Sequence, residues 1–382
     1  MPHQYSDRHP LTWGALVPTF RRPQSLAASI AHILEQRRPP SQVVVIAADS
    51  DPQTDGDALR RWLGDRLDGV DFEFLRTPAG TCMQRNAGIE RMRTDITLTV
   101  DDDIYFPPDA MTTAMAVFEA DPQHRVGGVG GWQREGPQMR TYRDAALARL
   151  GLAPAVDPSA AVAPATSTPL HALRKLERGA RSRARSAFWD LVFKYYMGDF
   201  FPAEEMTPPH PMPAALRDDP QLEATVWLAG GTCAFRTALL QRHHYNEMFT
   251  RYAPAEDIDI SFRMSREACM VRHQGFWGWH TGEAGGRPNN GRMLFYTMLN
   301  LAYIGRTSMR MRPQLWHHFR RHQSRTRKAW ATLGLLSGRG LEAYRGARLG
   351  GRAAEALFDA KDDDLGAVYE REAAAADARD YA

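Results

Sequence analysis

Short apolar runs alternate with amphipathic segments along the first third of the chain. The apolar runs lie at residues 14–18, 43–48, 71–75, 96–100 and 126–129, and each has the length of a buried strand. Between them, segments at 23–34, 55–67, 81–92 and 109–119 have the apolar spacing of helices. Strands and helices that alternate with short connections predict an α/β fold with a single doubly wound, mostly parallel sheet.

The alternation breaks after Arg143. Residues 144–223 are expected to form a flexible, partly basic insertion, because 152–169 are rich in Ala, Pro, Ser and Thr and 171–185 are basic. Beyond it, the pattern predicts strands at 224–228 and 270–274, and helices at 237–244, from 256 onward and at 289–304. Residues 313–352 are basic and helical in character, and 373–382 are typical of a frayed terminus. We therefore expect one domain over residues 1–310 and a basic helical extension over 311–382.

Composition limits the class of protein. The chain has 382 residues, 43% of them hydrophobic, which is enough for one large domain with additions or for two domains. A net charge of +3 from 48 basic and 45 acidic residues excludes a polyelectrolyte. Three distant cysteines, Cys82, Cys233 and Cys269, form neither a disulfide framework nor a zinc pattern, which favours a reducing compartment. The polar N-terminus has no apolar signal core and no run has the length of a membrane span, so we expect a cytoplasmic protein.

Three consecutive aspartates, Asp101, Asp102 and Asp103, follow the apolar run at 96–100. Ligands usually bind at the carboxyl ends of strands in such sheets. Carboxylate oxygens there suit Mg²⁺ or Mn²⁺, and these ions commonly bind together with phosphates. The alternative is a solvated acidic turn. Because neither Gly-x-Gly-x-x-Gly nor a Gly-Lys-Ser/Thr end follows the first strand, a dinucleotide site and a P-loop are excluded.

An ordered set of motifs extends the picture to residue 263. The motifs are Val17-Pro18-Thr19-Phe20-Arg21-Arg22-Pro23, Asp49, Arg85-Asn86-Ala87-Gly88, Asp101-Asp102-Asp103, Gly230-Gly231-Thr232 and Glu256-Asp257-Ile258-Asp259-Ile260-Ser261-Phe262-Arg263. With these motifs the chain resembles the family 2 glycosyltransferases with the GT-A fold, over roughly residues 11–303. This resemblance implies a GT-A catalytic domain over 1–310 and an inverting, metal-dependent transfer of a sugar from a nucleoside diphosphate sugar to a hydroxyl of a glycan, lipid-linked or small-molecule acceptor.

The resemblance also implies a donor site. Asp49 would hydrogen-bond the nucleotide base, although Ala47-Ala48-Asp49-Ser50 departs from the family's Asp-Asp-Gly-Ser run and leaves the base open. The alternative interpretation is that Asp49 caps a turn. Gly230 and Gly231 would let the backbone pass close to the donor sugar or acceptor, and a plain turn is their alternative. The full expected donor set is Pro18, Thr19, Arg21, Asp49, Arg85, Asn86, Asp101, Asp102, Gly230 and Gly231.

The same resemblance places a divalent ion, Mn²⁺ or Mg²⁺, at the aspartates. Asp103 would bind the ion, Asp101 would face the ribose side and contribute to the metal site, and Asp102 would point elsewhere. His280, after an aromatic run, would be a further ligand, with packing in an aromatic cluster as the alternative. Arg85 would contact the diphosphate or donor sugar. The alternative is a plain position on the surface of a helix.

An inverting transfer needs a carboxylate that takes the proton of the acceptor hydroxyl. The resemblance makes Asp257 this base and gives Glu256 a role in acceptor binding or at the helix start. Which of these two residues is the base stays open. The alternative interpretation of both is that they cap the start of a helix. A non-catalytic nucleotide-sugar-binding protein would tolerate the loss of both. A sugar-phosphate nucleotidylyltransferase would need a Gly-rich loop that is missing after the first strand.

Two basic stretches, 171–185 and 320–352, contain interleaved aromatic and apolar residues. They are either solvated helix faces or a surface that attaches the protein to anionic lipids at the inner face of the plasma membrane. Nucleic-acid binding is a third option, but no recognition motif in the sequence supports it. Lack of a Gln-x-x-Arg-Trp motif argues against a processive polysaccharide synthase, whereas Trp279-His280 and the basic tail are similar to rhamnosyl- and galactofuranosyl-transferring members. Donor sugar and oligomeric state stay open.

Overall fold

The computed structural model describes residues 10–136, 138–152, 201, 205–249, 253–282, 289–309, 316–337 and 340–378. Within them, nine strands form one sheet in the order β3-β2-β1-β4-β8-β6-β9-β5, and β7 pairs with β9. The first four strands along the chain lie parallel to one another. They are β1 (Trp13–Thr19), β2 (Gln42–Ala48), β3 (Asp71–Thr77) and β4 (Ile96–Val100).

The other half of the sheet is mixed. β8 (Thr232–Arg236) runs antiparallel to β4 and to β6 (Val126–Arg134), and β6 runs parallel to β9 (Cys269–His280). β5 (Ile104–Tyr105) and β7 (Leu222–Thr225) pair antiparallel with β9. The predicted α/β fold class is confirmed.

Helices cover both faces of the sheet because successive strand side chains point to opposite faces. Ala15, Val17 and Val43 pack in one apolar cluster with α1 (Pro23–Leu34), α2 (Gly56–Leu63) and α4 (Ala110–Glu119). Leu16 and Val44 pack in the other with α3 (Thr81–Ile89), α7 (Thr237–His243) and α8 (Glu256–Ser265). Short 3₁₀ turns occur at Gly64–Leu67, Ala214–Leu216 and Asp362–Asp364.

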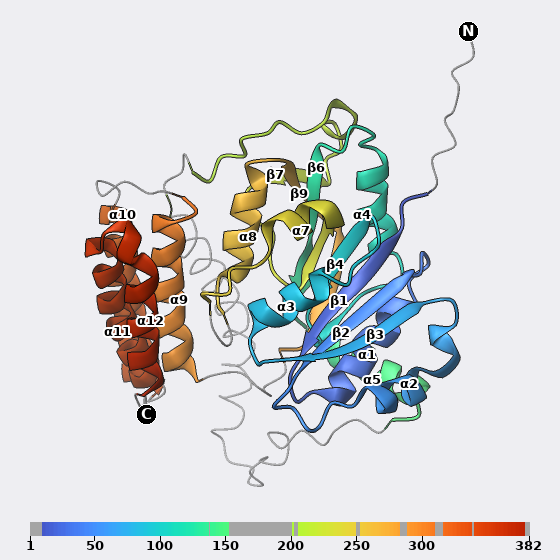
Figure 1. Ribbon diagram of the computed structural model, residues 1–382, viewed down its shortest axis with the longest axis horizontal. Coiled ribbons are helices and arrows are strands. Elements are labelled where there is room, and N and C mark those ends of the chain that lie inside the picture. The colour runs from blue at the N-terminus through green and yellow to red at the C-terminus, as the bar shows by residue number, and fades with distance from the viewer. Residues whose placement is uncertain are drawn as a thin grey trace, which may run out of the picture.

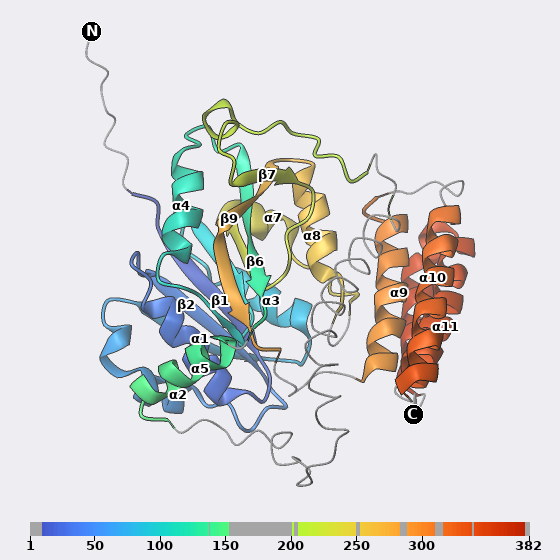
Figure 2. The ribbon, with the colours of Figure 1, turned by 180° about the vertical axis from the view of Figure 1, so that it is seen from behind.

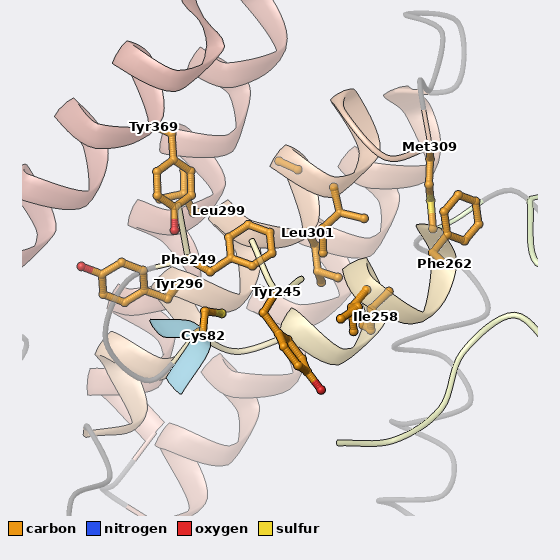
Figure 3. Packing of buried hydrophobic residues seen from close by; sticks show 14 of the residues in the cluster. Cys82, Tyr245, Phe249, Ile258, Phe262, Tyr296, Leu299, Leu301, Met309 and Tyr369 are labelled. Atoms are coloured by element: carbon orange, nitrogen blue, oxygen red, sulfur yellow. The ribbon is translucent and has the colours of Figure 1, made fainter. Parts of the chain in front are cut away.

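Four helices stand together beside this layered unit (Figures 1 and 2). They are α9 (Asn290–Arg306), α10 (Trp316–Ser337), α11 (Gly340–Asp359) and α12 (Leu365–Asp377). Figure 3 shows the junction, where Ile258 of α8, Leu299 of α9 and Tyr369 of α12 belong to one packed cluster. The division of the chain at residue 310 stays a prediction, and α9 packs along α11 across it. No described helix is long and apolar enough to cross a membrane.

Several element boundaries differ from those expected. The strand predicted at 224–228 is wrong in position, because β7 ends at Thr225 and β8 starts only after Gly231. β9 is one strand through to His280 rather than a strand that ends at 274. α5 (Gln138–Arg149) packs on α1 beyond the expected break. The expectation that residues 373–382 are frayed is wrong as far as Asp377, because Ala373 and Ala376 are buried in α12. Most of the expected insertion at 144–223, including 171–185, lies outside the described residues.

Candidate active site

The three aspartates lie directly after β4, near the middle of the sheet. Asp102 and Asp103 are buried, whereas the Asp101 side chain is 36% exposed. Thr19 Oγ1, at the end of β1, donates to Asp102 Oδ2 at 2.6 Å. The carboxylates therefore lie at the carboxyl edge of the parallel strands, where the alternation of strands and helices predicted them.

Arg22 pairs with two of these carboxylates. Its Nη1 lies 2.9 Å from Asp102 Oδ1 and 3.3 Å from Asp103 Oδ2. Burial raises the pKa of Asp102 to about 7, although the Arg22 guanidinium opposes the shift. Arg22 was not among the expected site residues. The sequence signal that could have indicated it is its position directly before Pro23, at the start of α1.

Asp103 and His280 approach each other from different strands. β5 pairs with the end of β9, so that Ile104 lies opposite His280. Asp103 Oδ1 is 3.4 Å from His280 Nε2. An octahedral ion with ligands at about 2.1 Å places neighbouring ligand atoms about 3 Å apart, so this separation fits two ligands of one ion. In the described part of the chain no group of three or more His, Cys, Asp or Glu side chains is arranged to hold a metal.

Arg85 connects the aspartates to α8. It is 1% exposed, so the helix-surface alternative is wrong. Its Nη2 lies 2.9 Å from Asp101 Oδ1, its Nη1 pairs with Glu256 Oε1, and its guanidinium lies 5.0 Å from the centre of the Tyr245 ring. Burial raises the pKa of Glu256 to about 8, although Arg85 opposes the shift.

Asp257 is held by backbone amides. Gly230 N donates to its Oδ2 at 2.8 Å and Ile258 N donates to its Oδ1 at 2.9 Å. Burial raises the pKa of Asp257 above its ordinary value, although these bonds oppose it. Gly231 has φ +82°, and a Cβ there would lie 2.6 Å from Asp101 Oδ2. The two glycines thus place backbone between Asp101 and Asp257, in a conformation that favours glycine.

The loops after β1 and β2 are joined by a carboxylate that was not among the expected site residues. Asp51 is fully buried and accepts from Arg21 N at 2.5 Å, Gln53 N at 2.8 Å and Thr54 Oγ1 at 2.6 Å. These bonds hold its pKa below the ordinary value, although burial alone would raise it. Asp49 is exposed at the end of β2. Pro18 lies half-buried in β1, and the exposed Arg21 side chain stacks on Phe20.

Asn86 makes contacts of a structural kind. Its Nδ2 donates to Tyr245 O and to Glu247 Oε1, both at 2.9 Å, and its Oδ1 accepts from Tyr245 N at 2.7 Å. These bonds tie α3 to the segment after α7. A hollow of about 610 Å³ opens beside Asn86, lined also by Thr77 and Glu247, and it does not include the aspartates.

Residues 15–164 match the family model described as glycosyl transferase family 2. Over this segment the chain is similar to family 2 glycosyltransferases. The matched segment contains β1 to β6 with the three aspartates, whereas Gly230, Glu256 and His280 lie beyond it. The match favours a transferase over the two alternatives, a non-catalytic binding protein and a nucleotidylyltransferase.

The solved structures that are similar to this chain share little sequence identity with it. The mannosyltransferase PcManGT from Pyrobaculum calidifontis, in complex with GDP-Man and Mn²⁺, has 13% identity and a TM-score of 0.48, over 98% of this chain and 82% of that one. TarS 1-349 from S. aureus has 12% identity and a TM-score of 0.46, over 96% and 91% of the two chains, and was also solved with UDP-GlcNAc. Such similarity does not transfer the ligands of these proteins to this chain. No curated protein matches the chain.

Proposed function

We propose that the chain transfers a sugar, with inversion, from a nucleoside diphosphate sugar to a hydroxyl of a glycan, lipid-linked or small-molecule acceptor, with the help of Mn²⁺ or Mg²⁺. The observation that carries the proposal is the buried Arg85 bridge between Asp101 and Glu256. It joins the carboxylates after β4 to the carboxylates that begin α8, although 155 residues separate Asp101 from Glu256 in the sequence. A donor at the first group and an acceptor at the second would therefore meet.

Asp103 and His280 would hold the divalent ion, and Asp101 would contribute from the ribose side. When bound, such an ion supplies a Lewis acid that stabilises the diphosphate leaving group. Hard oxygen and imidazole ligands suit Mn²⁺, and phosphate oxygens commonly complete the coordination of such ions. Asp49 would hydrogen-bond the base at the exposed end of β2. Arg21, whose backbone amide is fixed by Asp51, would lie at the same side.

Asp257 would act as the base. The acceptor oxygen forms a bond to the anomeric carbon as the bond from that carbon to the phosphate oxygen breaks, and the hydroxyl proton passes to Asp257. The amides of Gly230 and Ile258 fix the orientation of its carboxylate. The raised pKa of Asp257 makes it a better proton acceptor than an ordinary aspartate. Glu256, tied to Arg85, would bind the acceptor or support the start of α8.

A thermal-shift series with UDP, GDP and their sugars, with Mn²⁺ or with EDTA, tests the donor and the metal together. A ligand that binds only the folded state at 100 times its Kd raises the unfolding free energy by about 2.7 kcal/mol. We expect Asp103→Ala to lose both the Mn²⁺-dependent shift and turnover. Asp109→Ala is the matched control, since Asp109 is 57% exposed and pairs with Arg37 at the surface. Full turnover of Asp103→Ala in EDTA would overturn the proposal, and NMR of the product anomer tests inversion.

We also propose that the C-terminal helices attach the enzyme to the inner face of the plasma membrane. α10 contains no acidic residue, and its described exposed side chains include Arg320, Arg321 and Lys328. On α11, Arg345, Arg348 and Arg352 are exposed at spacings of three and four residues, so they share one side of the helix. α10 and α11 pack against each other. Charge complementarity favours an anionic lipid surface, and attachment there suits a lipid-linked acceptor.

A further inference from the structure

Tryptophan and arginine side chains cover the outer end of β6 and β9. The strand register sets Trp132 beside Trp277 and Arg134 beside Trp279. The Arg134 guanidinium lies 4.1 Å from the centre of the Trp277 ring, and Trp277 packs edge-on to Trp279 with centroids 5.4 Å apart. Arg272 lies 5.8 Å from the Trp132 ring. We call these five residues the Trp–Arg face.

Trp132 is 43% exposed, so a large part of its indole ring faces solvent. Large exposed aromatic side chains on a soluble protein often mark a binding surface. Gly128 and Gly130 precede it on the same side of β6 and contact Leu228. Leu228 belongs to the same apolar cluster as Ile258 of α8. Trp132, which Arg272 contacts, therefore lies on the α8 side of the sheet, the side that presents Glu256 and Asp257, whereas Trp279 packs against Tyr142 and the cluster between α1 and α5.

A hydrogen-bond chain connects the face to the proposed base. Gln133, between Trp132 and Arg134, donates from Nε2 to Gly230 O. Gly230 N donates in turn to Asp257 Oδ2. Because the Gln133 side chain contacts the turn that precedes β8, the Trp–Arg face adjoins the backbone that holds the base.

The face is also cationic. Arg134 has no ion-pair partner within the described ranges, whereas Arg272 lies opposite Glu223 in the pairing of β7 with β9 and donates to the carbonyl of Trp227 at 3.0 Å. Burial lowers the pKa of Arg272, although the Glu223 carboxylate opposes the shift. A carboxylate or phosphate on a ligand would supply a counterion for Arg134 and accept paired hydrogen bonds.

We propose that the Trp–Arg face is the acceptor platform and that it takes an oligosaccharide with carboxylate or phosphate substituents. The inference rests on the proposed function and names its acceptor class. The apolar C–H face of a pyranose ring lies flat on an indole, while the guanidinium groups bind the charged substituents. Neutral glycans would lack the contact with the guanidinium groups, and free anions would lack the contact with the indole ring.

Binding of trigalacturonate by isothermal titration calorimetry tests the platform, with its neutral methyl ester and inorganic phosphate as the other ligands. We expect trigalacturonate to bind at least about tenfold more tightly than either. Trp132→Ala and Arg134→Gln should each raise its Kd about fivefold or more, the effect of roughly 1 kcal/mol. Leu341→Ala, at a 58% exposed apolar side chain, and Arg61→Gln, at a 70% exposed arginine, should leave the Kd unchanged.

Two outcomes overturn the platform: trigalacturonate binds no more tightly than its ester, or both face variants keep the wild-type Kd. Circular dichroism of each variant checks folding, and both substitutions are at exposed positions. Mn²⁺-dependent donor binding by the wild-type protein is measured in parallel. If donor binding fails, the proposed function is wrong. If donor binding holds and trigalacturonate does not bind, only the platform is wrong.

Discussion

Arg85 and Arg22 show which parts of the site the sequence could predict. The positions of Asp101 to Asp103 follow from the pattern, because a strand of five buried residues ends at Val100. The partners of the aspartates do not, because Arg85 meets Glu256 across 171 residues and Arg22 meets Asp102 across 80. Such pairs depend on how helices dock on the sheet, and periodicity describes only the local spacing of side chains.

Paired substitutions decide between the two candidate bases. Asp257→Asn keeps the shape of the side chain and removes its proton acceptor, so we expect kcat to fall by about 10²- to 10⁴-fold. Glu256→Gln should reduce kcat less and change the KM for the acceptor more, because Glu256 is committed to Arg85. Steady-state kinetics with saturating donor measure both. If Glu256→Gln caused the larger loss in kcat, the roles would be exchanged.

Glu256 should also make stability depend on pH. Its pKa in the folded protein, about 8, lies above the ordinary value of 4.5, so between these values the folded state binds a proton that the unfolded chain has released. The contribution of Glu256 to stability is therefore lost as pH rises through this window. Relative to wild type, Glu256→Gln should gain on the order of 4 kcal/mol in unfolding free energy between pH 5 and pH 8.5. Urea unfolding measures the difference, with the exposed Glu370→Gln as control; a pH-independent difference would contradict the shifted pKa.

At the scale of elements, most strands and helices of the first half agree with the sequence pattern, and the errors have physical causes. The apolar residues 226–228 have strand-like composition, yet they lie between β7 and β8. The backbone turns at Gly231, where φ of +82° cannot occur within a strand. The end of α12 was expected to fray because its alanines give no strong apolar period, although α12 buries Ala373 and Ala376. Tertiary contacts decide such segments.

Glycines set the distance between α9 and α11. A Cβ at Gly346 would overlap the carbonyl oxygen of Gly291, and a Cβ at Gly350 would lie 2.7 Å from Phe295 O. In an exposed helix, Gly→Ala usually stabilises by about 1 kcal/mol. Here Gly346→Ala should instead destabilise by about 1–3 kcal/mol, because the two helices must separate. Gly366→Ala in α12, whose nearest contact would be Met248 Cε at 3.9 Å, is the control and should not destabilise. Denaturant unfolding measures both, and equal effects would contradict close packing.

At the scale of the whole molecule, the four C-terminal helices and the sheet share one apolar cluster. Phe249, after α7, contacts Tyr303 of α9 and Tyr369 of α12, with ring centroids 5.9 and 6.2 Å apart. Tyr369 OH donates to Asn300 Oδ1 at 2.7 Å, and Asn300 Nδ2 donates to Pro254 O at 2.7 Å. Pro254 lies two residues before α8. The C-terminal helices therefore contact the segment that leads into α8, where the proposed base lies.

Vesicle binding tests whether the basic sides of α10 and α11 are such a surface. Each Lys or Arg near an anionic membrane contributes about 1 kcal/mol, so the triple variant Arg345→Gln, Arg348→Gln and Arg352→Gln should bind about 100-fold more weakly. Co-sedimentation with phosphatidylglycerol vesicles at low salt measures the partition, and phosphatidylcholine vesicles should not bind. The matched control removes the same net charge by Arg→Gln substitutions at Arg37, Arg61 and Arg242, which are 73%, 70% and 58% exposed on other helices or loops.

The outcomes distinguish a membrane surface from a solvated one. If both triple variants lost binding equally, the attraction would come from net charge; if wild type bound neither vesicle, these arginines would be a solvated surface. Selective loss in the α11 variant would place the membrane at the C-terminal helices, because the control differs only in where the charges lie.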